Sequence, residues 1–468
     1  MCGDFLTMQN IYNSIAELCC LVISSCTEDF FVKYSCVSSD EKKRINLIVG
    51  EKIPALFSDK NCTNIRHISE SDLNDAFFLN LDALSSELAL EADYFAIVGL
   101  IQILDEALDS ILQKKISEFQ QDDFSVVLNT NRESTGIGLL PRCSCAWERK
   151  HRLAHSYNRM DNFLFNMLLM ENSILGELID KHFFLKKDLF PNFSTKKSLK
   201  IAATPLRLER NFEIQPYNED KVQYFKIKYH ECDFDSENAL VWEKIQLAAK
   251  NKSDIIVFPE MLGNPKMADF ITKKLKALSE SERKDIPSLI ILPSHWEKRR
   301  NTVTIIDKHG DIVCSQSKQN PFRAEQEGTG YLEGILSSLV VNIFHFEGIG
   351  RIAILICKDF LTTKYMEQLM RCFKLTLIIV PSFSTGSYDF RQSFDLCAHD
   401  DCNVVWINTC AAFEKGKEAN FENIGYIRKR ISRTDDEAQM LCKMPICEGA
   451  FMGKCAHDCV FYETISGV

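Results

Sequence analysis

The stretch Gly350-Arg-Ile-Ala-Ile-Leu-Ile-Cys357-Lys-Asp-Phe360 indicates the fold of the second half of the chain. Its apolar residues, several of them β-branched, fall on both alternating faces and end abruptly at a cysteine followed by charged residues. Such a run is typical of a strand that is buried on both sides. Open α/β architectures place their chemistry at the polar ends of such strands. We therefore expect Cys357 at a strand end, beside polar groups.

Two further β segments end in a residue that can take part in catalysis. Ser253-Asp-Ile-Ile-Val-Phe-Pro-Glu260 is an apolar strand that ends at proline, with a carboxylate just past it. Residues 301–307 and 311–318 predict a hairpin with its turn at His309-Gly310, and Lys318 stands at its end. A glutamate, a lysine and a cysteine therefore close three β segments, in that order along the chain.

This order resembles the Glu-Lys-Cys triad of the nitrilase (carbon–nitrogen hydrolase) superfamily, over roughly residues 197–410. Residues 199–204 look like that family's first strand, 237–250 like its first helix, 378–382 like the strand after the nucleophile, and 391–408 like the next helix and strand. Because the order and spacing of several elements agree, the match is more specific than a single motif. The resemblance implies an α/β fold for residues 197–468, an αββα four-layer sandwich, and it also implies a homo-oligomer.

The resemblance also assigns roles to the triad. Amides and nitriles are poor electrophiles, and a cysteine nucleophile divides the reaction into two easier steps through a covalent intermediate. Cys357 would be that nucleophile, and Glu260 would carry protons as general base and acid. Lys318 would stabilise the oxyanion together with the backbone N–H of Lys358. No metal and no organic cofactor is implied.

Two positions beside the triad differ in how well they fit. Glu325, seven residues past Lys318, falls where many family members carry a second glutamate that orients the lysine and the substrate, and Glu327 is the fallback. After the cysteine the family commonly has an aromatic or acidic residue and then an acidic one. Here Lys358 departs from the pattern and Asp359 keeps it. A lysine side chain at that place can alter the pocket or favour an acidic substrate.

The predicted activity is hydrolysis of a non-peptide C–N bond in a small molecule, with an amide favoured over a nitrile. Singly, Glu260 could end a strand in solvent, Lys318 could be a surface lysine and Cys357 an ordinary buried thiol; only their combination favours a triad. One alternative transfers the acyl group to an amine. Another is a nitrilase-like sensor or scaffold without turnover, fused to a helical module that acts on nucleic acid.

Residues 1–190 predict a mostly helical domain, with helices at 8–25, 73–90, 93–119 and 159–183 and a loop near 129–142. Residues 190–197 are a plausible linker before the domain at 197–468. The segment 209–236 is longer than the family fold requires. It could be a lid, an interface or an excursion from the fold, and the sequence does not choose among these three. After Ala412 the sequence predicts a divergent, cysteine-rich tail in place of the family's two further strands.

One basic segment of the first domain carries a second motif. Residues 148–157 resemble the Arg-x(4–6)-His motif of HEPN-type ribonucleases, with Arg149 and His155 in the two places. There a histidine handles the 2′-hydroxyl proton and an arginine steadies phosphate. Lys150 departs from the small polar residue that is usual after the arginine. The simpler interpretation is a solvated basic helix end, and nucleic acid is a partner only if the motif acts.

Composition and net charge argue against several other classes of function. The net charge of -10 argues against binding of nucleic acid or acidic membranes by the whole surface, and no apolar run reaches the ~20 residues of a spanning helix. Without a secretory signal, 19 scattered cysteines indicate reduced thiols in a cytoplasmic protein.

Met1-Cys-Gly is a three-residue match to N-terminal nucleophile enzymes. In the tail, the spacings between the possible metal ligands do not fit a structural zinc site. These residues are Cys442, Cys447, Cys455, His457 and Cys459.

Overall fold

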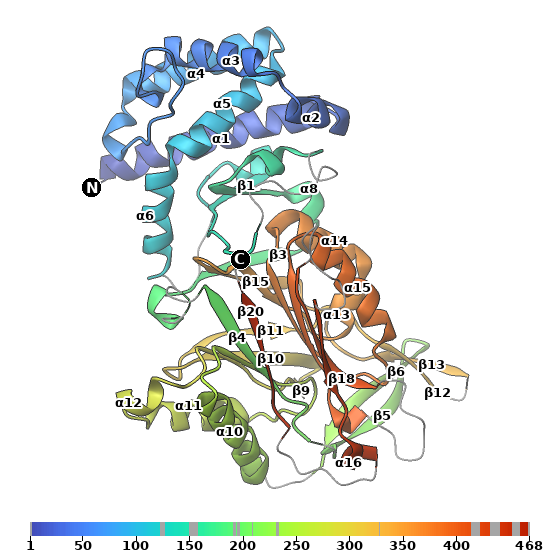
Figure 1. Ribbon diagram of the computed structural model, residues 1–468. Helices are drawn as coiled ribbons and strands as arrows, with labels where there is room; N and C mark the ends of the chain where they lie inside the picture. Colours follow the sequence, from blue (N-terminus) through green and yellow to red (C-terminus); the bar gives the residue numbers. More distant parts are fainter. Residues whose placement is uncertain are drawn as a thin grey trace.

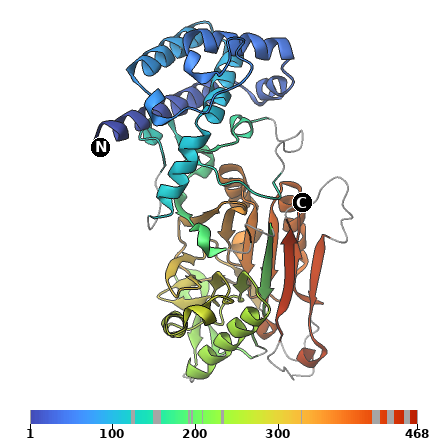
Figure 2. The same ribbon diagram turned by 60° about the vertical axis from the view of Figure 1, so that its left-hand side comes forward.

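A computed structural model shows a helical unit at the N-terminus stacked on one end of a sandwich of two β-sheets (Figures 1 and 2). The residues that the structure describes are 2–121, 127–148, 158–190, 193, 197–207, 209–230, 234–326, 328–412, 422–430, 440–451 and 459–466.

The helical unit is built around a buried central helix, α5 (Tyr94–Ala107). Three of its helices begin at capping residues, Ser38, Asn74 and Asp93, whose side chains accept the free backbone N–H three residues later. The structure confirms the helices predicted over 8–25 and 73–90, and it divides the one predicted over 93–119 at Leu108. The helices are α1 (Cys2–Ser25), α2 (Glu28–Ser35), α3 (Ser39–Lys52), α4 (Asp75–Leu90), α5 (Tyr94–Ala107) and α6 (Asp109–Phe119).

The helix predicted over 159–183 is wrong, because this segment contains two strands, β2 (Met167–Glu171) and β3 (Ile179–Phe184). β2 pairs antiparallel with β1 (Ile137–Pro141), which lies in the predicted loop. The side chains of β2 alternate between two cores: Met167 and Leu169 pack in the helical unit, and Leu168 and Met170 pack in the sandwich. A strand that is buried on both faces has no polar face, so its apolar spacing also fits a helix.

β3 joins the second half of the chain. It pairs in parallel with β14 (Val340–Phe346), with Ile179 opposite Val340. The range 1–190 therefore contributes an edge strand to the sandwich, while the predicted division of the chain at 190 stays a prediction.

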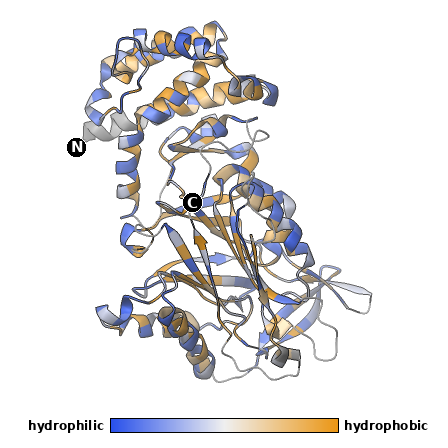
Figure 3. Ribbon diagram, viewed as in Figure 1, coloured by the Kyte–Doolittle hydropathy of each residue, from blue (hydrophilic) through white to orange (hydrophobic). Residues whose placement is uncertain are grey.

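The sandwich is the αββα arrangement that the sequence predicts. Along β4 (Ser198–Ala203), Ile201 and Ala203 face the other sheet, whereas Ala202 packs under the outer helices α10 (Phe234–Lys250) and α11 (Met267–Lys276). Figure 3 shows apolar residues gathered in the strands of both sheets. The first sheet has the order β11 (Ile312–Ser317), β10 (Arg300–Asp307), β8 (Leu289–Ile291), β7 (Ile255–Val257), β4 (Ser198–Ala203) and β20 (Phe461–Ser466), with β9 (His295–Glu297) paired to β10.

The second sheet is mixed, with a parallel centre. Its order is β19 (Leu441–Pro445), β18 (Asn423–Arg428), β17 (Asn403–Ile407), β16 (Leu377–Pro381), β15 (Gly350–Ile354), β14 and β3. The helices outside the two sheets are α10 (Phe234–Lys250), α11 (Met267–Lys276), α13 (Lys358–Leu361), α14 (Thr363–Phe373) and α15 (Tyr388–His399).

Two segments differ from the sequence prediction or complete it. The tail supplies three strands, β18, β19 and β20, because its short apolar runs extend the edges of both sheets. The segment 209–236 contains a hairpin of β5 (Phe212–Glu219) and β6 (Val222–Tyr229). β6 pairs with β13 (Thr329–Glu333), which pairs with β12 (Arg323–Gln326), and the four strands form a small separate sheet.

No helix within the described ranges is both long enough and apolar enough to cross a membrane.

The packing between the sheets gives a first prediction. Ile201 is fully buried there, and its replacement by alanine leaves a cavity, so Ile201→Ala should lower the free energy of unfolding by about 2–5 kcal/mol. Ile312 lies on β11 with 52% of its surface exposed, and Ile312→Ala should cost less than about 1 kcal/mol. Urea denaturation followed by tryptophan fluorescence compares the two variants. Equal losses would contradict the assigned burial.

Candidate active site

Glu260, Lys318 and Cys357 each lie just past the end of a strand, and the packing of the two sheets brings them together. Glu260 follows β7 and Lys318 follows β11 of the first sheet, while Cys357 follows β15 of the second. Their exposed fractions are 1%, 3% and 5%. The three side chains that the sequence singled out therefore lie in a buried polar cluster between two apolar sheets.

The ammonium group of Lys318 lies between two carboxylates. Its Nζ is 2.9 Å from Oε1 of Glu260 and 2.8 Å from Oε2 of Glu333. Burial alone would lower the pKa of Lys318, but the two carboxylates outweigh it and hold the pKa well above its usual value. Lys318 is therefore a fixed cation and hydrogen-bond donor at neutral pH, and it cannot act as a base there.

Glu260 is held at both of its oxygens. Asn301 Nδ2 donates to Oε1 (2.7 Å), and the backbone N–H of Phe383 donates to Oε2 (2.8 Å). Asn301 lies on β10, and Phe383 follows β16 of the second sheet. The carboxylate thus has a fixed orientation at the junction of the two sheets.

Cys357 has a strained backbone. Its φ of 48° and ψ of −98° lie outside the regions that L-residues prefer, and it directly precedes the short helix α13. Its N–H donates to the carbonyl of Pro381 (2.9 Å), which fixes the turn against β16. Backbone strain of this kind costs of order 1–3 kcal/mol and concentrates at functional sites. The turn also leaves the N–H of Lys358 at the first helical position, where no intrahelical acceptor exists.

The Cys357 thiol is protonated at rest. Burial raises its pKa well above the usual value, the negative charge of Glu260 raises it further, and the positive charge of Lys318 opposes both. These electrostatic effects require that the thiol lies near both charged groups. Its Sγ is also 4.0 Å from the carbonyl oxygen of Phe383, the residue whose N–H binds Glu260.

Asp359 joins the cysteine turn to the loop that follows Lys318. Its carboxylate accepts hydrogen bonds from the backbone N–H groups of Gln319 (3.1 Å), Asn320 (2.7 Å) and Ile356 (3.3 Å). Burial raises the pKa of Asp359 to about 6, although these donors oppose the shift. Asp359 thus fixes the position of Lys318 relative to Cys357.

The second glutamate of the site is Glu333, and the prediction of Glu325 is wrong. Glu325 is exposed on β12, where it forms an ion pair with Arg323 (3.3 Å). The pairing of β12 with β13 turns the chain back to Phe322, four residues past Lys318. There the N–H of Glu333 donates to the carbonyl of Phe322 (2.7 Å), and the N–H of Phe322 donates to Oε2 of Glu333 (2.9 Å). A hairpin centred on Gly328, if recognised in the sequence, would have pointed to Glu333. Glu327, the fallback, lies outside the described residues.

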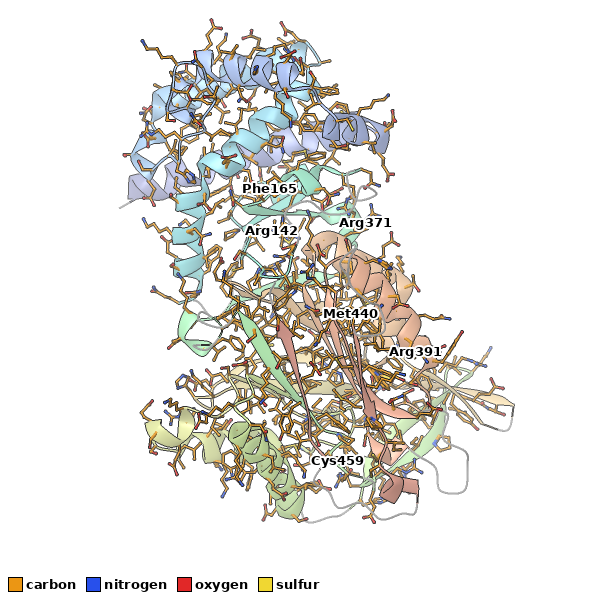
Figure 4. All side chains as sticks on the ribbon, viewed as in Figure 1. Arg142, Phe165, Arg371, Arg391, Met440 and Cys459 are labelled. Atoms are coloured by element: carbon orange, nitrogen blue, oxygen red, sulfur yellow. The ribbon has the colours of Figure 1, made fainter. Side chains whose placement is uncertain are left out.

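Several other predicted residues are placed away from the triad or are not described. Arg149 and His155 of the ribonuclease-like motif lie outside the described residues, as do Cys455 and His457. Cys442 and Cys447 are free thiols, and Cys459 (labelled in Figure 4) accepts a hydrogen bond from Thr204 at its carbonyl. Within the described ranges, no group of three or more His, Cys, Asp or Glu residues could hold a metal ion.

No protein-family model matches the chain, and no curated protein matches it in sequence. Among solved structures it is similar to an amidase from Nesterenkonia sp. (13% identity, 57% of this chain and 90% of that one, TM-score 0.37). It is also similar to the C. elegans NitFhit protein (16% identity, 58% and 61%, TM-score 0.36). A third is Saccharomyces cerevisiae Nit3, a member of branch 10 of the nitrilase superfamily (12% identity, 57% and 90%, TM-score 0.36).

Likenesses this low support no function by themselves, and they give the ribonuclease resemblance no support. The function proposed below therefore rests on the side-chain geometry.

The charges around Cys357 predict opposite effects of two substitutions. Glu260→Gln removes the charge that raises the thiol pKa, so Cys357 should be alkylated at lower pH than in the wild type. Lys318→Met removes the charge that lowers it and should shift alkylation to higher pH. Shifts of about one pH unit or more are expected.

Iodoacetamide labelling across a pH series, followed by peptide mass spectrometry, measures both shifts. Cys402, which is buried just before β17 of the same sheet, is the internal control for general opening of the fold. Shifts in the same direction for both variants would show that the thiol does not sense these charges.

Proposed function

We propose that this chain hydrolyses a non-peptide C–N bond of a small molecule, an amide in preference to a nitrile, through an acyl-enzyme on Cys357. The observation that carries the proposal is the Lys318 ammonium, held between two buried carboxylates beside a cysteine with a strained backbone. A structural cysteine needs neither the strain nor the charged neighbours. The same residue types in the same chain order form the catalytic triad of the nitrilase superfamily.

The protonated thiol determines how the first step proceeds. Cys357 Sγ attacks the amide carbon while Glu260 takes the thiol proton, because a free thiolate is disfavoured beside that carboxylate. Glu260 then gives the proton to the leaving nitrogen, the C–N bond breaks, and a thioester and ammonia or an amine result. In the second step Glu260 takes a proton from water, whose oxygen attacks the thioester. The thiol and a carboxylic acid are released.

Two donors are available for the negative charge that develops on the substrate oxygen. Lys318 keeps its proton at neutral pH because two carboxylates hold its pKa well above the usual value. The backbone N–H of Lys358 lies directly after the nucleophile and has no intrahelical acceptor. Both are fixed before the reaction begins, so they stabilise the oxyanion without reorganisation.

Two buried acceptors at the site favour an amide over a nitrile as the substrate. Oε1 of Glu333 and Oδ1 of Asn301 are buried and have no hydrogen-bond partner among the described residues. Buried acceptors without a partner are costly. A primary amide brings N–H donors that would satisfy such acceptors, whereas a nitrile nitrogen brings none.

The two glutamates near Lys318 provide a matched test. Glu333→Gln removes one of the two carboxylates that hold the ammonium, and it should lower kcat/KM by about 100-fold or more, as loss of a buried charged contact does. Glu325→Gln alters only an exposed pair and should leave kcat/KM within about threefold of the wild type. Initial rates of ammonia release measure both. A larger loss for Glu325→Gln would restore the original assignment.

The activity itself is tested with a panel of primary amides and the corresponding nitriles. Wild-type protein should release ammonia from at least one amide, and Cys357→Ala and Glu260→Gln should not. Intact-protein mass spectrometry should detect an acyl adduct on Cys357 when turnover is quenched with acid. An adduct that passes to added hydroxylamine but never to water would indicate acyl transfer, and no adduct with any substrate would refute the proposal.

A further inference from the structure

Glu333 lies at the end of β13, in the small separate sheet. In that sheet β13 lies between β12 and β6, and Figure 1 shows these strands with β5 at one side of the sandwich. Leu332 pairs with Tyr224 of β6 and Glu333 with Phe225, and the N–H of Gly334 donates to the carbonyl of Phe225 (2.9 Å). The hairpin of β5 and β6 therefore supports the strand that brings Glu333 into the site.

The base of the hairpin is fixed to the sandwich. Phe212 at the start of β5 lies opposite Tyr229 at the end of β6. The ring of Phe212 packs on the ring of Phe383 at 5.4 Å, and the hydroxyl of Tyr229 accepts the N–H of Trp296 (2.8 Å). Ile227 of β6 is buried in the same apolar cluster as Phe212. Because its base is held in this way, the hairpin is a fixed support for β13.

Arg299 joins the outer end of the hairpin to the chain just past Glu333. It lies in the turn between β9 and β10. Its Nε donates to the carbonyl of Gly334 (3.2 Å), and its Nη1 is 3.3 Å from Oε2 of Glu219, the last residue of β5. The carbonyl of Arg299 accepts the N–H of Leu336 (2.6 Å). Arg299 thus holds the segment after Glu333 at two points and ties it to the hairpin.

The same turn leads directly to contacts with the other two charges of the site. Asn301, two residues after Arg299, donates from Nδ2 to Oε1 of Glu260 (2.7 Å). The carbonyl of Asn301 accepts the N–H of Lys318 (2.8 Å). This short segment therefore contacts Glu260, Lys318 and the residues that follow Glu333. A shift of Arg299 relative to β13 would change the position of Glu333 relative to the other two charges.

The hairpin approaches β13 too closely for a side chain at Gly334. A Cβ atom there would lie 3.1 Å from the carbonyl oxygen of Phe225 and would overlap the hydroxyl of Tyr217. The ring of Tyr217 is itself stacked on the ring of Tyr224 (5.4 Å). Glycine directly after Glu333 is therefore what lets the hairpin pack against the strand that carries the carboxylate.

We infer that Arg299 is a positioning residue, which acts with the hairpin of β5 and β6 to hold the Glu333 carboxylate against Lys318. The inference rests on the proposed function, in which Glu333 belongs to the site, and it adds the residues that fix this carboxylate in place. It also gives a supporting role to the long segment that contains the hairpin.

The pH dependence of Cys357 alkylation tests the inference without a substrate. Burial raises the pKa of the Cys357 thiol most, and the charges of Glu260 and Glu333 add to it. If Arg299→Met displaces Glu333, its charge acts less on the thiol, and the pH of half-maximal iodoacetamide labelling should fall by roughly 0.3 unit or more. Glu333→Gln should lower this pH further. Loss of the Arg299 charge alone would raise the thiol pKa, so the direction of the shift identifies displacement of Glu333.

Three further variants sharpen this test. Arg300→Met, at the adjacent exposed arginine, is the matched control and should shift the labelling profile by less than roughly 0.1 pH unit. Glu219→Ala should act in the same direction as Arg299→Met but by less, because their ion pair is half exposed. Arg299→Met added to Glu333→Gln should give no further shift, because Arg299 acts through Glu333. Additive shifts, an unchanged profile for Arg299→Met, or an equal shift for Arg300→Met would each show that the inference is wrong.

Initial rates of ammonia release give a second measurement, with any amide that the wild type hydrolyses. Arg299→Met should lower kcat by about 3- to 30-fold and change KM by less than about twofold, because a charged group of the site is displaced. Absence of hydrolysis by the wild type would refute the proposed function and leave the labelling test intact, so the two failures are distinguishable. Thermal melting and labelling of Cys402 separate displacement of Glu333 from loss of folding. If Arg299→Met does not fold, the direction of the Glu219→Ala shift decides the inference.

Discussion

The candidate site depends on one buried cation with two buried counter-charges. Taking Lys318 out of water is costly, and the attraction of Glu260 and Glu333 at 2.9 and 2.8 Å is what makes it tolerable. Removal of either carboxylate leaves charge that burial cannot screen. The three charged groups of the site therefore stabilise one another. Burial and the charge of Glu260 hold the pKa of the Cys357 thiol beside them well above its usual value.

Assembly of the site also requires both sheets. Glu260 and Lys318 come from the first sheet and Cys357 from the second, so the triad exists only when the apolar faces between the sheets are packed. Two polar links cross that interface at the site. The N–H of Phe383, from the second sheet, holds Glu260, and Asp359 accepts the N–H groups of the loop that follows Lys318. The strained turn at Cys357 persists because these bonds surround it.

The sequence predicted what is local and periodic. The strands that precede Glu260, Lys318 and Cys357 are short apolar runs followed by polar residues, and that position marked the three as candidate catalytic residues. The sequence prediction failed where a contact between residues far apart in the chain determines the structure. Glu333 reaches Lys318 only because β12 and β13 fold back as a hairpin, and a count of residues from Lys318 pointed instead to exposed Glu325. β2 was mistaken for helix because its partners on both faces are apolar.

The helical unit is joined to the sandwich by more than a linker. Alternate residues of β2 belong to the cores of both parts, so separation of the parts would expose apolar surface on each. Polar contacts reinforce the junction: Arg132 pairs with Asp180 of β3 (2.9 Å), and Trp147 Nε1 donates to the carbonyl of Thr376 beside β16 (3.2 Å). β3 and β16 belong to the same sheet as β15, the strand that precedes Cys357. The helical unit is therefore fixed to the sheet from which Cys357 extends.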